Sequence, residues 1–120
     1  MGKEMKKIRL QRDDKKDLVF EGVELAESSN RRFEGPGQNR YTTLTLYKTK
    51  GGKYVLLDEY RTHWQGEDDR ITAEVYDTVD DLLEELIGPD GEVSEMKKEL
   101  IRSAAAEDEA FQGVLDERID

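Results

Sequence analysis

The sequence predicts a single α+β domain, residues 1–120: an antiparallel meander of about five strands with two C-terminal helices packed on one face. Two observations lead to this prediction. Before Asp77, polar and apolar residues alternate with the period of two that is typical of strands. After Asp77, apolar residues recur at helical spacing. Strands followed by helices, rather than alternating with them, indicate an α+β fold.

The first two strands are indicated by alternation of apolar and polar residues. Ile8 and Leu10 alternate with polar residues and indicate a short first strand, and Leu18–Glu27 predicts the second. Residues 28–39 then contain the turn formers Gly35-Pro36-Gly37. We therefore expect a flexible surface loop over residues 28–39.

The clearest hairpin joins strands expected at residues 41–49 and 53–64, which are rich in Thr, Tyr, Val and Leu. Gly51-Gly52 lies between them, and glycine supplies the positive φ that a two-residue primed turn requires. Such a turn pairs Lys50 with Lys53 and therefore places Leu46 opposite Leu57.

This pairing predicts two different sheet faces. One face would gather aliphatic side chains for the helices to cover: Leu44, Leu46, Val55 and Leu57. The other would gather aromatic and hydroxyl side chains: Tyr41, Thr43, Thr45, Tyr47, Thr49, Tyr54, Leu56, Asp58, Tyr60, Thr62 and Trp64.

The C-terminal part predicts a fifth strand at Arg70–Asp77 and then two helices. Apolar residues within Val79–Ile87 fall at i, i+3, i+4, i+7 and i+8, and Thr78 or Asp77 can cap this helix. Gly88-Pro89 ends it, and Ser94 caps a second helix that runs to about Glu107.

The two ends of the chain have few apolar anchors. Residues 1–5 and 112–120 are therefore expected to be disordered. Near the C-terminus, the possible apolar anchors are Phe111, Val114, Leu115 and Ile119.

The charge is strongly negative and unevenly distributed. The net charge is −10, with seven basic and three acidic residues in 1–16 but four basic and fifteen acidic residues in 77–120. An acidic body repels phosphate backbones, which disfavours nucleic acid as a partner. No apolar run is long enough to span a membrane, and no cysteine is present for a disulfide scaffold. No signal peptide is evident, so we expect a cytoplasmic protein.

Tyr and Trp combine a large contact area with a polar tip, which suits protein interfaces. The expected aromatic face therefore predicts binding of another protein or self-association, through five residues: Tyr41, Tyr47, Tyr54, Tyr60 and Trp64. A solvated sheet face and a small-molecule pocket remain as other interpretations of the same pattern.

Catalytic and metal-binding patterns are weak. His63 is the sole histidine, and the carboxylates of Glu67-Asp68-Asp69 fit no EF-hand spacing. We therefore expect no enzyme activity, no cofactor and no metal site. The alternative function is nucleic-acid or nucleotide binding, through the basic N-terminus and a loop patch of Arg31, Arg32 and Arg40.

Three short segments resemble motifs of an uncharacterised bacterial family, the EXLDI proteins. Residues 117–120 (Glu-Arg-Ile-Asp) look like a truncated Glu-x-Leu-Asp-Ile ending, with Ile119 in place of Leu. Residues 46–55 are similar to that family's strand–turn–strand, and residues 75–82 to its strand-to-helix junction. The resemblance implies a fold and a bacterial origin but no activity.

Overall fold

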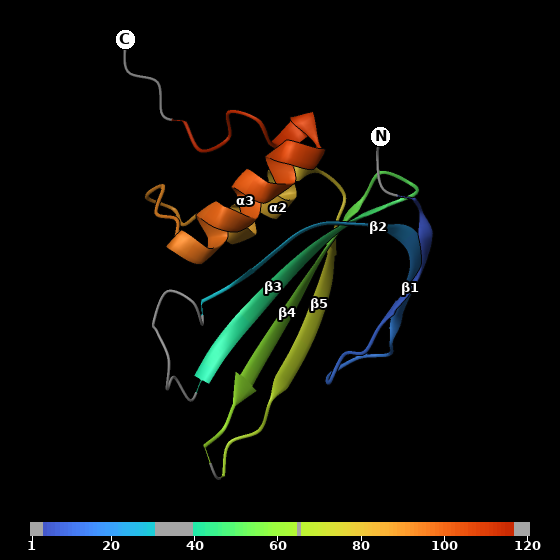
Figure 1. Cartoon of the computed structure of the whole chain (residues 1–120), viewed down its shortest axis with the longest axis vertical. Helices are drawn as coiled ribbons and strands as arrows, with labels where there is room; N and C mark the ends of the chain where they lie inside the picture. The colour runs from blue at the N-terminus through green and yellow to red at the C-terminus, as the bar shows by residue number, and fades with distance from the viewer. Residues whose placement is uncertain (1–3, 31–39, 65, 117–120) are drawn as a thin grey trace.

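The computed structural model describes residues 4–30, 40–64 and 66–116 (Figure 1). Five antiparallel strands pair in chain order, and two helices follow them, which confirms the predicted α+β meander. The strands are β1 (Lys6–Leu10), β2 (Leu18–Ser29), β3 (Arg40–Thr49), β4 (Tyr54–Thr62) and β5 (Arg70–Tyr76). The helices are α2 (Val79–Leu86) and α3 (Glu95–Glu107), and a 3₁₀ turn, η1 (Glu109–Phe111), comes after α3. Among the described residues, no helix is long and apolar enough to cross a membrane.

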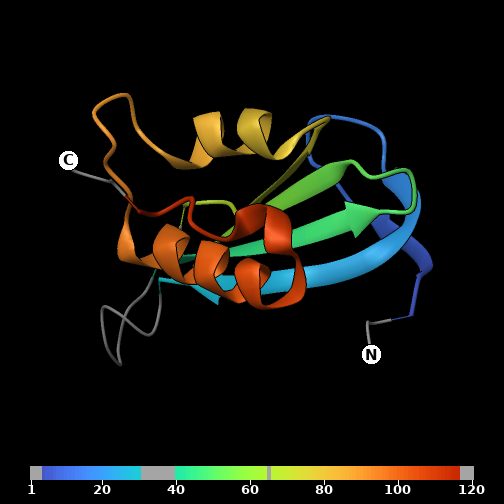
Figure 2. The same ribbon diagram turned by 90° about the horizontal axis from the view of Figure 1, so that it is seen from above.

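Both helices lie on one face of the sheet (Figure 2). The Thr78 hydroxyl accepts a hydrogen bond from the Asp81 amide at the start of α2, and Ser94 accepts one from Lys97 at the start of α3. The residues buried between helices and sheet are Leu25, Ala26, Leu44, Leu46, Tyr54, Leu56, Leu82, Leu86, Leu100, Ile101, Ala104 and Phe111. This cluster is the main hydrophobic core.

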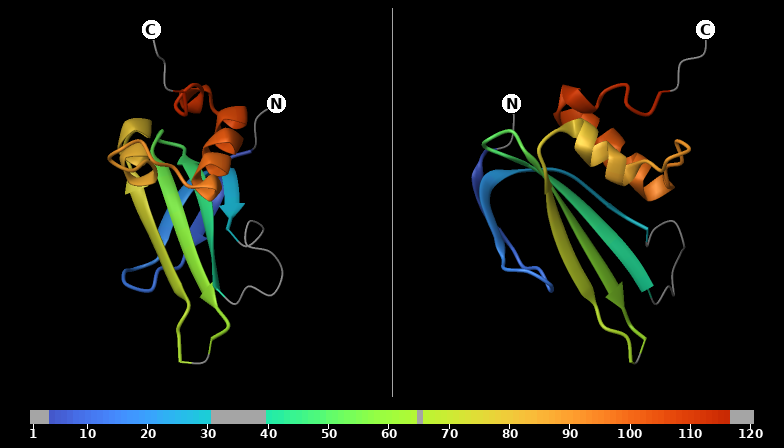
Figure 3. Two further views of the ribbon diagram at one scale, coloured as in Figure 1. Left: turned by 90° about the vertical axis from the view of Figure 1, so that its left-hand side faces the viewer. Right: turned by 180° about the vertical axis from the view of Figure 1, so that it is seen from behind.

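The opposite face of the sheet holds a second, smaller core that the sequence pattern did not predict. β1 and the first half of β2 curl over that face (Figure 3). Leu10, Val55, Leu57 and Ala73 are buried there, with Phe20 packed beside them. The sheet is therefore covered on both sides over part of its area.

The segment between β1 and β2, residues 11–17, docks against the outer edge of β5. The Asp13 amide donates to the Ile71 carbonyl at 3.0 Å, and the Asp13 carboxylate accepts from the Ile71 amide at 2.7 Å. Arg12 Nη1 donates to the Ala73 carbonyl at 3.1 Å. These bonds occupy backbone groups that an edge strand would otherwise expose to other chains.

The predicted two-residue turn at Gly51-Gly52 is wrong. The Thr49 amide donates to the Lys53 carbonyl at 2.8 Å, and the Gly52 amide donates to the Thr49 carbonyl at 3.0 Å. The loop therefore has three residues, 50–52, and only Gly52 has a positive φ, +89°. A turn followed by one left-handed residue is the usual three-residue hairpin loop, whereas a primed two-residue turn of type I′ needs two left-handed residues.

The longer loop shifts the register of β4 by one residue. Leu46 pairs with Leu56 instead of Leu57, and Thr43 pairs with Glu59 instead of Tyr60. Because side chains alternate between faces, this shift moves every β4 side chain to the face opposite the one expected. The expected aliphatic and aromatic faces do not form: Val55 and Leu57 lie in the second core.

Other boundaries differ by a few residues. β2 continues to Ser29, so the first two residues of the expected loop 28–39 are strand, and residues 31–39 lie outside the described part of the chain. In the C-terminal segment, Val114 and Leu115 pack against the main core.

The corrected turn yields a stability prediction. We expect Gly52→Ala to lower the free energy of unfolding by about 1 kcal/mol, since alanine must adopt a left-handed conformation there. Gly51→Ala is the matched control, because Gly51 is not left-handed and its added Cβ would meet only the Thr49 hydroxyl at 3.9 Å. Urea denaturation measures both variants. Equal losses for the two variants would contradict the three-residue loop.

Candidate functional site

The five residues expected to form one binding face are separated in the structure. Tyr54 lies in the main core, where its ring packs edge-on against Phe111 at 5.4 Å. Tyr47 lies on the other face, 5.6 Å from the Phe20 ring, and burial raises the pKa of its phenol. Tyr60 pairs with Thr42, and the alternation of side chains places it on the same face as Tyr54. The register shift explains this separation.

Tyr41 and Trp64, the remaining two, lie at the same end of the sheet, where β3 begins and β4 ends, but each contacts a different neighbour, and Arg40 and Tyr41 point to opposite faces of β3. The Tyr41 ring lies 6.4 Å from the His63 ring. The Arg40 guanidinium lies 5.4 Å from the centre of the Trp64 ring, within the range of a cation–π interaction. We call these four residues, Arg40, Tyr41, His63 and Trp64, the Trp64 tip.

A network of hydrogen bonds holds the Trp64 tip in place. Glu67 Oε1 accepts from Arg40 Nε at 2.9 Å and from the Thr62 hydroxyl at 2.7 Å. The Thr62 hydroxyl in turn accepts from the Trp64 amide at 3.1 Å. The bonds from Thr62 and then Arg40 lower the pKa of Glu67. At neutral pH this carboxylate is therefore charged and fixes the position of Arg40.

Asp69, in the same loop, also has a structural role. Asp69 accepts hydrogen bonds from the Thr62 amide at 2.9 Å and from Arg61 Nη1 at 3.4 Å. The bond from the Thr62 amide is the main reason that the pKa of Asp69 is lowered. Glu67 and Asp69 thus use their carboxylates to close the β4–β5 loop. Among the described residues, no group of three or more possible ligands is placed to hold a metal ion.

Trp64 is the most exposed large apolar side chain of the described part of the chain, with 52% of its surface accessible. Burying such a side chain against a partner releases a large apolar area from water. Trp and Arg are also the residue types that most often dominate binding energy at protein interfaces. The chemistry of the Trp64 tip is therefore that of a contact surface.

The alternative basic patch is only partly described. Arg31 and Arg32 lie outside the described residues, and Arg40 is paired with Glu67. In the basic N-terminal segment, Arg9 forms an ion pair with Asp17 at 3.2 Å. Lys15 forms one with Glu74 of β5 at 3.0 Å. Arg9, Lys15 and Arg40 are thus paired with carboxylates of the chain itself.

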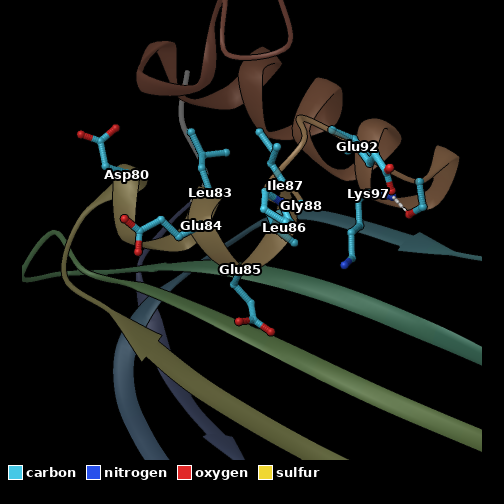
Figure 4. A pocket seen from close by; sticks show the side chains of 12 residues that line it. Asp80, Leu83, Glu84, Glu85, Leu86, Ile87, Gly88, Glu92 and Lys97 are labelled. Atoms are coloured by element: carbon cyan, nitrogen blue, oxygen red, sulfur yellow. Dashed lines mark hydrogen bonds between the residues drawn. The ribbon is translucent and has the colours of Figure 1, made fainter.

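A groove in the helical layer was not predicted from the sequence (Figure 4). It has a volume of about 1190 Å³ and is bounded by α2, the loop of residues 88–94 and the start of α3. Its lining residues are Asp80, Leu83, Glu84, Glu85, Leu86, Ile87, Gly88, Pro89, Glu92, Val93, Ser94 and Lys97. The acidic residues of α2 were visible as charge in the sequence, but the apolar floor beside them required the tertiary fold.

No family model, no curated protein and no solved structure matches the chain. The resemblance to the EXLDI proteins therefore stays a prediction.

Proposed function

We propose that this protein is a non-enzymatic interaction module that binds another protein through the Trp64 tip. The observation that supports the proposal is a half-exposed tryptophan whose neighbouring arginine is already fixed by Glu67. A contact residue that is ordered before binding loses less conformational entropy when the partner arrives. An interface centred on Trp64 would therefore gain the free energy of burying this apolar side chain at a small cost in conformational entropy.

The charge of the tip favours a protein over a nucleic acid as partner. The Arg40 charge is balanced by Glu67, and Asp68 and Asp69 lie in the same loop. The whole chain carries a net charge of −10. A phosphate backbone would meet repulsion here, and its binding would weaken steeply as salt concentration rises. We expect partner binding to change little between about 50 and 200 mM salt, a range over which binding through phosphate contacts weakens by several orders of magnitude.

Trp64 is the sole tryptophan, so its fluorescence reports directly on the tip. Once a partner has been captured from the native host, we expect the emission of Trp64 to shift to shorter wavelength in the complex. Trp64→Ala should weaken binding by about 2 kcal/mol, or roughly thirtyfold, as expected for an interface hot spot. Isothermal titration calorimetry measures this change.

The control is Val75→Ala, which removes another exposed apolar side chain (43% accessible) on β5, outside the tip. This variant should bind the partner with unchanged affinity. Equal affinity of wild type and Trp64→Ala, or equal loss in both variants, would show that binding does not use the tip. Self-association is checked by sedimentation velocity, where a dimer lost in Trp64→Ala identifies a second copy as the partner.

A further inference from the structure

The groove in the helical layer combines an apolar floor with an acidic rim. Leu83, Ile87 and Val93 are half-buried and line the groove, and Leu83 and Val93 also pack against the main core. Glu84 and Glu92 are exposed at its rim. The volume of about 1190 Å³ is above the usual range of roughly 300–1,000 Å³ for small-molecule sites. Its size and open shape suit a peptide segment.

The negative charge of the rim is not neutralised within the described part of the protein. Four carboxylates line the groove, Asp80, Glu84, Glu85 and Glu92, and none of them forms an ion pair among the described residues. Lys97 is the one basic residue of the lining. The groove therefore presents a net negative surface around an apolar floor.

The position of two of these carboxylates is unfavourable for α2 itself. Glu84 and Glu85 lie in the C-terminal half of the helix, whose last turn has no basic residue. The C-terminal end of a helix carries partial negative charge, so acidic side chains there reduce its stability. A local arrangement that costs stability without a compensating contact is typical of functional sites.

Two residues of the groove lining also influence a carboxylate of the sheet. Glu85 and Lys97 extend toward the strands (Figure 4). Both influence the titration of Asp58 on β4, whose pKa is raised mainly because its carboxyl group is removed from water. Asp58 is therefore near groove residues of both charges, Glu85 and Lys97, and near Arg70 of β5.

We propose that this groove binds a basic amphipathic segment of a partner protein, with its apolar side chains on Leu83, Ile87 and Val93 and its Lys or Arg residues facing the carboxylates. The complementary charge is the argument for this occupant. A second copy of the chain carries the same net charge of −10 and would be repelled. The chain's own basic N-terminal segment already forms β1, which pairs with β2, and contacts the edge of β5 through Arg12.

This inference goes beyond the function proposed for the Trp64 tip. The groove lies in the helical layer, whereas the tip lies where the β4–β5 loop projects away from the helices (Figure 1). The two surfaces share no residue. A substitution could therefore abolish partner binding at one surface and leave binding at the other surface intact.

The proposal is tested with three synthetic peptides: one built of Lys and Leu with helical amphipathic spacing, one with Ser in place of Leu, and one with Glu in place of Lys. Isothermal titration calorimetry at 150 mM salt should show binding of the Lys/Leu peptide alone, since charge steering and the apolar contact are both needed. Equal binding of the Lys/Ser peptide would show attraction to charge without a groove. Binding of the Glu/Leu peptide would overturn the proposed polarity.

The variant that tests the site is the triple change Glu84→Gln, Glu85→Gln and Glu92→Gln. It should weaken binding of the Lys/Leu peptide about tenfold or more, as loss of close charge pairs does. The matched control, Glu4→Gln, Glu107→Gln and Glu109→Gln, removes the same charge from exposed positions outside the groove. It should bind within about twofold of wild type. Equal losses in both triple variants would overturn the proposal.

Two further outcomes complete the test. The groove variant should melt at a higher temperature than wild type, because it removes repulsion at the C-terminal end of α2. A lower melting temperature would show that these carboxylates stabilise the fold, which would contradict a role in ligand binding. A dimer in sedimentation velocity that disappears in the groove variant would identify a second copy as the occupant and overturn the assignment to a basic partner.

Discussion

Replacing Asp108 with alanine is expected to lower the free energy of unfolding by about 3 kcal/mol. Only 9% of the Asp108 side chain is exposed, and its carboxylate accepts hydrogen bonds from Lys48 Nζ and the Tyr54 hydroxyl, each at 3.0 Å. The Ala110 amide donates a third, also at 3.0 Å. The variant leaves these donors without a charged acceptor and detaches the end of α3 from β3 and β4. Chemical denaturation measures the loss.

Two variants serve as references for Asp108. Asp14→Ala removes an exposed carboxylate in the β1–β2 connection and should change stability by less than about 0.5 kcal/mol. Tyr54→Phe removes one of the three donors and should cost about 1 kcal/mol. A loss for Asp108→Ala no larger than that of Asp14→Ala would show that the cluster does not stabilise the fold.

The contribution of Asp108 should also depend on pH. Burial alone would raise the pKa of its carboxyl group, but the hydrogen bonds from Ala110, Lys48 and Tyr54 outweigh burial and lower the pKa below its ordinary value. The folded protein thus binds this proton less tightly than the unfolded chain does. The stabilisation is complete above the unfolded pKa of about 3.9 and is lost as the pH falls through the folded pKa. The difference in stability between wild type and Asp108→Ala should shrink over that acidic range.

Gly22→Ala is expected to destabilise the protein by about 2–3 kcal/mol, corresponding to a fall in melting temperature of roughly 10 °C. A Cβ atom added to Gly22 would meet the carbonyl oxygen of Lys48 on β3 and would approach the Phe20 ring to 3.1 Å. The carbonyl is backbone, so it can move only if the two strands separate. Gly22 lies where β2 curves over the second core, just before the register shift at Glu24/Ala26.

The control for Gly22 is again Gly51→Ala, whose added Cβ lies in nearly open space. Differential scanning calorimetry of the two variants separates the close strand contact from the general effect of replacing glycine. A melting temperature of Gly22→Ala within about 2 °C of the control would contradict the approach of β2 to β3 at this point.

The helices and their caps were predictable because the interactions that define them are local. Thr78 and Ser94 cap α2 and α3 as expected, through bonds that span three residues. The strands were also placed correctly to within a few residues, since alternation is visible in a single segment. The fold class followed from the order of these elements.

The register of the β3–β4 hairpin could not be derived from the same pattern. Two adjacent glycines are compatible with either a two-residue or a three-residue loop, and both lengths leave the alternation within each strand unchanged. Long-range contacts accompany the three-residue loop: Tyr54 packs against Phe111, and its hydroxyl reaches Asp108, fifty-four residues away. These contacts place Tyr54 in the main core, so the expected aromatic face was lost.

The candidate sites also depend partly on residue types visible in the sequence and partly on the tertiary fold. Arg40, Tyr41 and Trp64 were identified by residue type, but the contacts of Arg40 with Trp64 and of Tyr41 with His63 depend on how β3 and β4 pair. The groove depends on the packing of α2 and α3 on the sheet and on the loop between them. The amino-acid sequence by itself determined the elements, their order and the net charge, because propensity, capping and alternation act over a few residues. Only the tertiary structure decided which side chains share a surface, because a one-residue change in loop length reverses the facing of an entire strand.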